Sequence, residues 1–100
     1  MKQRKSKGTK HKGRIVYQVE ESRSGGVFQA VCPELDITAF GDTPEGAKES
    51  LRSQVTMYLE DCDKLGALDE TLIEAGFYFD GEAWTSNLVA PVKDPDIVIL

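Results

Sequence analysis

The stretch from residue 43 to residue 66 constrains the fold of this chain more than any other. Thr43 is a residue type that caps the start of a helix, and Pro44 suits the first helical position. Glu45 suits the positive end of the helix dipole. Gly66 is a typical helix stop. Between them, apolar residues recur at spacings of four, four, three, four and three, with Leu59 widening the stripe: Ala47, Leu51, Val55, Tyr58, Cys62 and Leu65. We expect one amphipathic helix from about Pro44 to Leu65 that covers a sheet.

Three runs before this helix alternate between apolar and polar residues, which is typical of strands. They span residues 15–20, 27–32 and 35–40. A polar segment with two glycines, residues 21–26, predicts the turn between the first two runs. We therefore expect a three-stranded antiparallel meander. The face that carries Ile15, Tyr17 and Val19 should share one core with the helix stripe.

The segment after Gly66 predicts a smaller set of elements. A short helix capped by Asp69 should end at Gly76. A hairpin turning at Asp80 and Gly81 should join residues 77–79 to residues 82–85. Residues 88–92 and 97–100 are two further extended candidates. The fold class expected is α+β: a three-stranded antiparallel meander packed on one long helix, with additional C-terminal strands.

Charge divides the 100 residues into a basic arm and an acidic body. Residues 1–14 hold seven basic residues and no acid, a charge of +7, while residues 15–100 hold five basic residues and all 17 acids, a charge of −12. We expect residues 1–13 to be a disordered arm and residues 14–100 to be one domain. No run approaches the roughly 20 apolar residues of a membrane span, and the basic arm lacks the apolar stretch of a signal peptide. The expected location is the cytoplasm.

Catalytic and metal-binding patterns are absent from the sequence. Cys32 and Cys62 lie 30 residues apart, and the single histidine, His11, lies in the basic arm. That spacing is not the clustered set that zinc needs, and no histidine is placed to activate a thiol. There is no phosphate-binding glycine loop and no nucleophile elbow. We predict a non-catalytic protein without metal or cofactor.

Two apolar segments predict a homo-oligomer, most simply a dimer. Residues 97–100, Ile-Val-Ile-Leu, must pair as a strand in their own sheet or in that of a partner. Four aromatic residues within eight positions offer a second apolar surface: Phe77, Tyr78, Phe79 and Trp84.

A set of short motifs then follows in order, without gaps, over about half the chain. They are Tyr17 with Glu20 and Glu21, the glycines Gly25 and Gly26, Phe28 with Ala30, Cys32 to Leu35, Gly41 to Thr43, and Tyr58 to Glu60. This pattern resembles the HicB-like antitoxins. The resemblance implies a partial ribonuclease-H-like α+β fold without catalytic activity, and a partner that is a small basic HicA-like toxin cleaving mRNA. Members of the family commonly carry a C-terminal DNA-binding domain as well, and no segment after Gly66 shows one; Gly46 also replaces the usual Glu.

Two functions remain open from the sequence. In the first, an antitoxin or interaction module binds the toxin through its acidic surface; the partner-binding residues predicted on the first three strands are Glu20, Glu21, Glu34 and Asp36. In the alternative, a stand-alone regulator binds nucleic acid through the arm; its contact residues would be Lys2, Arg4, Lys5, Lys7, Lys10, Lys12 and Arg14. A minimal ribonuclease-H-type nuclease is a third, weaker reading, because it needs a carboxylate cluster that the sequence does not show.

Overall fold

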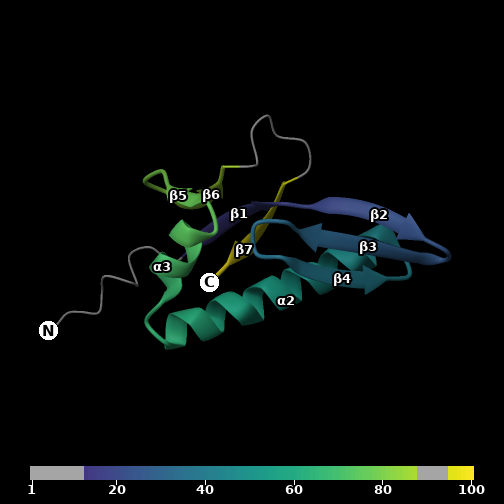
Figure 1. Cartoon of the computed structure of the whole chain (residues 1–100), viewed down its shortest axis with the longest axis horizontal. Helices are drawn as coiled ribbons and strands as arrows, with labels where there is room; N and C mark the ends of the chain where they lie inside the picture. Colours follow the sequence, from purple (N-terminus) through teal and green to yellow (C-terminus); the bar gives the residue numbers. More distant parts are fainter. Residues whose placement is uncertain (1–12, 88–94) are drawn as a thin grey trace, which may run out of the picture.

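The fold is α+β, with two sheets sharing one long helix in a computed structural model that describes residues 13–87 and 95–100 (Figure 1). The expected fold class is therefore confirmed. The strands are β1 (Arg14–Gln18), β2 (Glu20–Ser24), β3 (Val27–Cys32), β4 (Ile37–Gly41), β5 (Phe77–Phe79), β6 (Ala83–Ser86) and β7 (Pro95–Ile99). The helices are α2 (Pro44–Lys64) and α3 (Leu68–Glu74).

The antiparallel meander is present, but its first strand is not the one expected. The sheet order is β2-β3-β4, and Ser24 pairs with Val27 across a two-residue turn. Residues 21–24, expected to be part of the turn, are a strand with every side chain exposed. Only Gly25 and Gly26 turn the chain, and Gly25 takes the positive φ of 65° that favours glycine. An exposed edge strand does not need alternating apolar residues, so the polar sequence of β2 resembled that of a turn.

The expected first strand, β1, belongs to a second sheet. The order there is β5-β6-β1-β7, with β1 parallel to β6 and antiparallel to β7. The chain continues from β1 through Val19 into β2, so one extended stretch serves both sheets (Figure 1). The expected strand at residues 97–100 is β7, which pairs within its own chain. Its proline, Pro95, is tolerated because it opens an edge strand.

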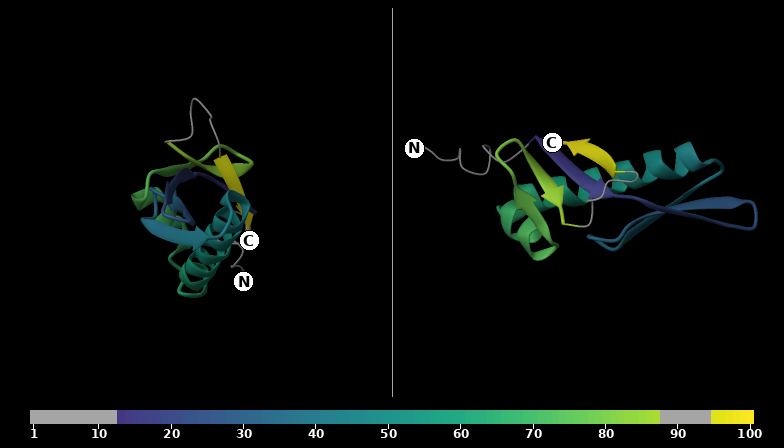
Figure 2. Two further views of the ribbon diagram at one scale, coloured as in Figure 1. Left: turned by 90° about the vertical axis from the view of Figure 1, so that its right-hand side faces the viewer. Right: turned by 90° about the horizontal axis from the view of Figure 1, so that it is seen from above.

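Helix α2 begins as the sequence predicts. Thr43 Oγ1 accepts a hydrogen bond from the Gly46 N–H at 2.9 Å, and Pro44 occupies the first helical position. The helix contacts β3 and β4 in one sheet, β7 in the other and α3. It runs along the length of both sheets (Figure 2).

The buried stripe of α2 differs from the expected one over the last two turns. Ala47, Leu51, Val55 and Cys62 are buried as expected, and Leu59 joins them. The prediction that Tyr58 and Leu65 belong to the buried stripe was wrong, because their exposed fractions are 43% and 82%. Strand β7 lies on the Leu59 flank, because Arg52, two turns before Leu59 on the same flank, bonds to Asp96 of β7. Tyr58 and Leu65 lie on the side of the stripe away from this flank and are exposed.

The elements after α2 follow the sequence with two changes. Helix α3 has no side-chain cap: Ala67 is its N-cap, and Asp69 lies inside the first turn rather than before it. The hairpin between β5 and β6 forms at Asp80, whose Oδ1 accepts hydrogen bonds from the N–H groups of Glu82 and Ala83, each at 2.9 Å. These bonds hold the pKa of Asp80 below its usual range. The extended candidate at residues 88–92 lies outside the described residues.

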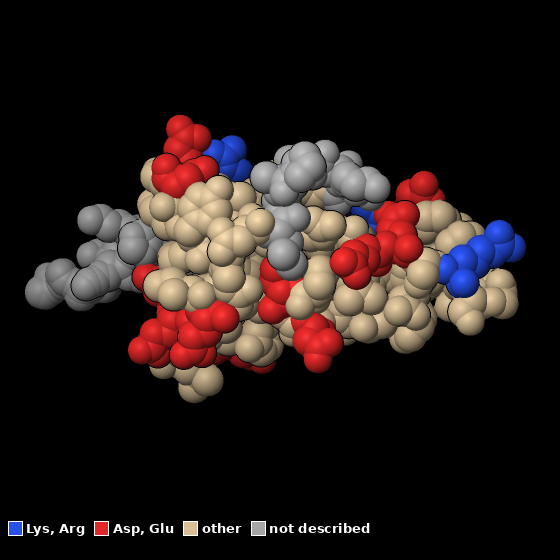
Figure 3. Space-filling view, turned by 45° about the horizontal axis from the view of Figure 1, so that its top comes forward, with Lys and Arg blue, Asp and Glu red and all other residues tan. Residues whose placement is uncertain are grey.

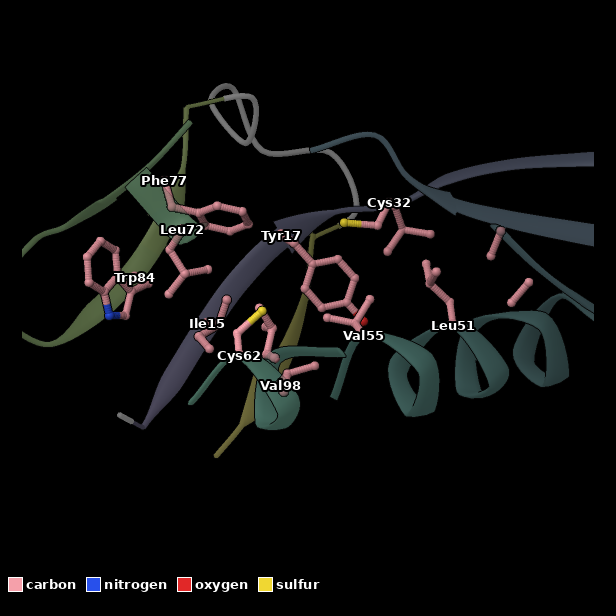
Figure 4. Close-up of a cluster of buried hydrophobic side chains, with 14 of the residues drawn as sticks. Ile15, Tyr17, Cys32, Leu51, Val55, Cys62, Leu72, Phe77, Trp84 and Val98 are labelled. Atoms are coloured by element: carbon pink, nitrogen blue, oxygen red, sulfur yellow. The ribbon is translucent and has the colours of Figure 1, made fainter. Parts of the chain in front are cut away.

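The core joins both sheets to the helices. It contains Ile15, Tyr17 and Val19 together with Leu51, Val55 and Cys62, as expected. Figure 4 shows the Tyr17 ring between the Cys32 and Val55 side chains on one side and the group around Phe77 and Trp84 on the other. Most of the aromatic cluster is core: Phe77 and Trp84 are buried and Phe79 is half-buried.

Candidate protein interface

The edge strand β2 presents two of the predicted partner-binding residues. Glu20 and Glu21 are consecutive in the strand and therefore point to opposite faces of the sheet. Both are exposed. The Glu21 carboxylate lies 3.8 Å from the Lys48 ammonium of α2. Glu20 is thus on the outer face of the three-stranded sheet, and Glu21 is on the side that faces the helix.

Glu34 has a structural role that the sequence did not predict. Its Oε2 accepts a hydrogen bond from the Gln18 N–H at 2.9 Å, and its Oε1 lies 3.4 Å from Cys32 Sγ. The carboxylate therefore ties the turn after β3 to the point where β1 passes into β2. Burial, and next the charge of Glu34, raise the pKa of the Cys32 thiol to about 12. A partner would meet a carboxylate that already has two bonds.

Asp36 lies in the turn between β3 and β4, not in a strand as expected. Its φ of 58° makes it the non-glycine residue with positive φ in the described chain, a conformation that Asp tolerates better than most residues. The side chain is exposed. It adds one negative charge to the turn that Glu34 anchors.

Among the basic residues predicted to contact nucleic acid, Arg14 alone falls within the described chain. It opens β1 and lies exposed, 3.7 Å from the Glu82 carboxylate. The expected nucleic-acid contacts at positions 2 to 12 lie outside the described residues. The domain extends one residue before its expected start at Arg14. The Gly13 carbonyl accepts a hydrogen bond from the Leu100 N–H at 2.9 Å and so continues the pairing of β1 with β7.

The structure reveals a surface that sequence reasoning missed, which we call the α2–α3 corner: Tyr58 and Asp61 of α2, Leu65 at its C-cap, and Glu74 of α3. Asp61 lies one turn from both Tyr58 and Leu65 on the helix surface. Helix α3 packs against α2, and burial, then Cys62, then Glu74 raise the pKa of Tyr58. The exposed Tyr58 and Leu65 thus lie near the acids Asp61 and Glu74 at the C-terminal end of the helix, where the basic Lys64 is also exposed.

One sequence signal could have located this corner. From residue 53 to residue 92 the chain has eight acidic residues and one basic residue, Lys64. The apolar stripe of the helix hid the signal, because Tyr58 and Leu65 keep the spacing of core residues. Figure 3 shows acidic side chains spread over one face of the molecule among uncharged surface, with few basic side chains between them.

A third group of polar residues fastens β7 to the rest of the fold. Arg52 of α2 donates to both carboxylate oxygens of Asp96, at 3.0 and 2.9 Å, and the buried Tyr17 hydroxyl lies 3.4 Å from Asp96 Oδ2. Burial, and next the charge of Asp96, raise the pKa of Tyr17. The bond with Asp96 likewise raises the pKa of Arg52. The arrangement fixes a strand to a helix.

The described part of the chain offers little for chemistry at a reactive centre. Over residues 13–87 and 95–100, no three His, Cys, Asp or Glu side chains are grouped so as to hold a metal ion. Cys32 and Cys62 are both buried and unpaired with each other. A hollow of about 210 Å³ on α2 is open to solvent and lined by Glu45, Lys48, Glu49 and Arg52. Neither described helix is long and apolar enough to cross a membrane.

No protein-family model, no curated protein and no solved structure matches this chain.

Proposed function

We propose that this protein is a HicB-like antitoxin that acts in the cytoplasm by binding, without catalysis, and neutralises a small basic HicA-like toxin that cleaves mRNA. The observation that carries the proposal is the α2–α3 corner. Tyr58 and Leu65 are exposed although they keep the phase of the core stripe, and Asp61 lies one turn from each of them. Exposed apolar groups within a charged rim are typical of protein interfaces, and tyrosine is a frequent anchor there.

The residues that carry the family resemblance support the proposal through their structural roles. Tyr17 is buried at the centre of the core, and Cys32 and Glu34 tie β3 to the β1–β2 junction. Gly41 allows the first turn of α2 to approach β4, and Thr43 caps that helix. The residues of the motif thus stabilise the fold. A family of proteins that share a fold but bind different partners would have such residues in common.

The order of the elements is compatible with a partial ribonuclease-H-like arrangement. Three antiparallel strands precede the long helix, and a later strand, β6, returns parallel to β1. The residues after Gly66 that the structure describes, 67–87 and 95–100, form α3, strands of the second sheet and their connections. This supports an antitoxin domain of the family without the usual DNA-binding unit in this part of the chain.

The test is made with the product of a short basic open reading frame beside the gene. Expressed alone, that product should arrest growth and cleave mRNA, and co-expression of this protein should restore growth. Association of the two purified proteins should slow as salt rises from about 0.1 M to about 1 M, because the Debye length falls from about 10 Å to about 3 Å. A neighbour that neither cleaves RNA nor binds would contradict the proposal.

Charge reversals locate the contact. Glu74→Lys at the α2–α3 corner and Glu20→Lys on β2 test the two acidic surfaces, and Glu49→Lys, on an exposed part of α2 outside both, is the matched control. We expect Glu74→Lys to lower the association rate more than the control, because a local charge acts more strongly than net charge. Glu20→Lys measures whether the strand residues take part. The purified protein alone should not cleave RNA with Mg²⁺ or Mn²⁺.

The basic arm supports a second candidate, a regulator that binds nucleic acid. Seven basic residues within the first 14 are a suitable set of phosphate contacts. In that case the logarithm of the DNA affinity should fall steeply with the logarithm of the salt concentration, and removal of residues 1–12 should abolish binding. Retention of DNA by the full chain, with no binding of a neighbouring toxin, would favour this candidate over the antitoxin.

A further inference from the structure

The outer face of the four-stranded sheet carries an uncharged row of side chains. Strand register places Tyr78 opposite Thr85, Thr85 opposite Val16, and Val16 opposite Ile97, so the four residues form one line across β5, β6, β1 and β7. Ile99 follows Ile97 on the same face. We call these five residues the apolar row. The opposite face of the same strands holds the buried Ile15, Trp84 and Val98.

Three members of the apolar row are exposed to solvent, and the other two, Val16 and Thr85, are half-buried. Tyr78, Ile97 and Ile99 have exposed fractions of 49%, 44% and 71%, and both helices pack on the other face of the sheet, where the core lies. The remaining exposed large apolar residues lie elsewhere, on α2, α3 and the three-stranded sheet: Val27, Phe40, Met57, Tyr58, Leu65 and Ile73. A row of this kind marks an interaction site more often than an ordinary surface.

We propose that the apolar row is the contact between two copies of this chain. Its five members are uncharged, and the charged residues beside it, Arg14 and Glu82, already form an ion pair of 3.7 Å. A self-contact through the α2–α3 corner would bring the like charges of Asp61 and Glu74 together. The apolar row is a face that two acidic molecules can bury against each other without that repulsion. This proposal does not depend on the antitoxin function.

The free edge of β7 is poorly suited to pairing with a strand of a second copy, which favours a dimer in which the two sheets pack face to face. The Leu100 N–H donates to the Gly13 carbonyl, so in this ladder Val98 and Asp96 also bond to β1, and the main-chain groups of Ile97 and Ile99 point outward. Pro95 has no N–H, and the Ile97 N–H already donates to Asp96 Oδ1 at 2.8 Å. Few donors remain for a neighbouring strand.

The area of the sheet indicates how tightly two copies should bind. Four strands spaced by about 4.8 Å span about 14 Å, and a strand of five residues spans about 17 Å. A contact of that size lies at the small end of specific interfaces, so we expect a dissociation constant on the order of 10–100 µM. The dimer should therefore appear as concentration rises.

Sedimentation equilibrium of the full chain tests the proposal between about 5 µM and about 1 mM. The average mass should rise from 11.0 kDa toward twice that value. Ile99→Lys, at an exposed position, should hold the protein at the monomer mass, and Ile97→Lys is a second variant should the first not fold. Leu65→Lys is the matched control, because it adds the same charge at a still more exposed position, and it should leave the dimer intact.

Salt separates this dimer from one held by the basic arm of one copy on the acidic body of another. Dimerisation through the apolar row should stay constant or strengthen as salt rises to about 1 M, because screening weakens the repulsion between acidic bodies. A monomer at every concentration overturns the proposal. So does a dimer that salt dissociates, or one that Ile99→Lys and Ile97→Lys leave unchanged.

Discussion

Gly41, the last residue of β4, shows how a missing side chain brings a sheet and a helix together. A Cβ at this position would collide with the Ala47 amide nitrogen and lie 2.7 Å from the Gly46 carbonyl carbon, both main-chain atoms of the first turn of α2. Main-chain atoms cannot rotate away as a side chain can. The glycine is therefore required by close approach, and its φ is not in the positive region.

Gly41→Ala should lower the free energy of unfolding by at least about 2 kcal/mol, because β4 and α2 must separate to admit the methyl group. Chemical denaturation with circular dichroism measures this. Gly26→Ala is the control: no atom lies within 4 Å of the added Cβ, and the change should be below about 1 kcal/mol. Equal effects of the two variants would show that α2 does not approach β4 this closely.

The Cys32 thiol gives the fold a stability that depends on alkaline pH. Burial raises its pKa from 9.0 to about 12 in the folded chain, so above pH 9 the unfolded state ionises while the folded state keeps its proton. The unfolded state then binds fewer protons, and the stability falls as pH rises. The contribution is fully present below pH 9.

Between about pH 8 and about pH 10.5, the protein should lose on the order of 1–2 kcal/mol more stability than Cys32→Ala does. Denaturant titrations at several pH values measure the difference. The buried thiol should also react with iodoacetamide only under conditions that unfold the chain. Parallel pH curves for the two proteins would mean that Cys32 titrates normally and that its packing beside Glu34 is looser than the structure indicates.

At the scale of elements, helix α2 separates what a periodic pattern determines from what its neighbours decide. Leu51 lies where both the pattern and the structure place the core, with no exposed surface, whereas Tyr58 keeps the pattern but is 43% exposed. The flank of α2 that bonds to β7 carries Arg52 and Leu59, whereas Tyr58 lies on the other side of the stripe.

Leu51→Ala should therefore cost about 2–5 kcal/mol of unfolding free energy, and Tyr58→Ala less than about 1 kcal/mol. Thermal or denaturant unfolding of the two variants side by side gives the comparison. A Leu51→Ala change below about 0.5 kcal/mol would place this residue on the surface and contradict the packing of α2 on the sheets. A large loss for Tyr58→Ala would mean that the α2–α3 corner is covered.

At the scale of the whole molecule, the charge separation between arm and body should matter for binding and not for folding. Residues 1–12 hold six of the 12 basic residues, so their removal changes the net charge from −5 to −11. They contain no aliphatic residue after Met1 to add to the core. Gly13 must be kept, because its carbonyl bonds to Leu100.

Removal of residues 1–12 should leave the thermal midpoint within about 3 °C of the full chain at 0.15 M salt. Differential scanning calorimetry provides the measurement, and the same comparison at about 1 M salt controls for the added repulsion within the acidic body. A larger loss that disappears at high salt would show that the arm binds the acidic surface of its own chain.

The sequence alone determined the features that depend on local chemistry and periodicity. The cap at Thr43, the first turn at Pro44, the hairpin at Asp80 and the α+β class follow from residue type and spacing, and all are present. The acidic body was also evident, since charge is additive along the chain. The antitoxin function and the residues that would meet a partner stay predictions that rest on this charge and on the resemblance.

Only the tertiary structure decided which elements cover which surface. β1 alternates as a meander strand would, yet it pairs with β6 and β7, which lie more than 60 residues away in the sequence. The exposure of Tyr58 depends on the side from which β7 reaches α2, and the apolar row depends on the register of four strands. Local sequence carries no information about such long-range pairing, because each strand satisfies its pattern equally well beside several neighbours.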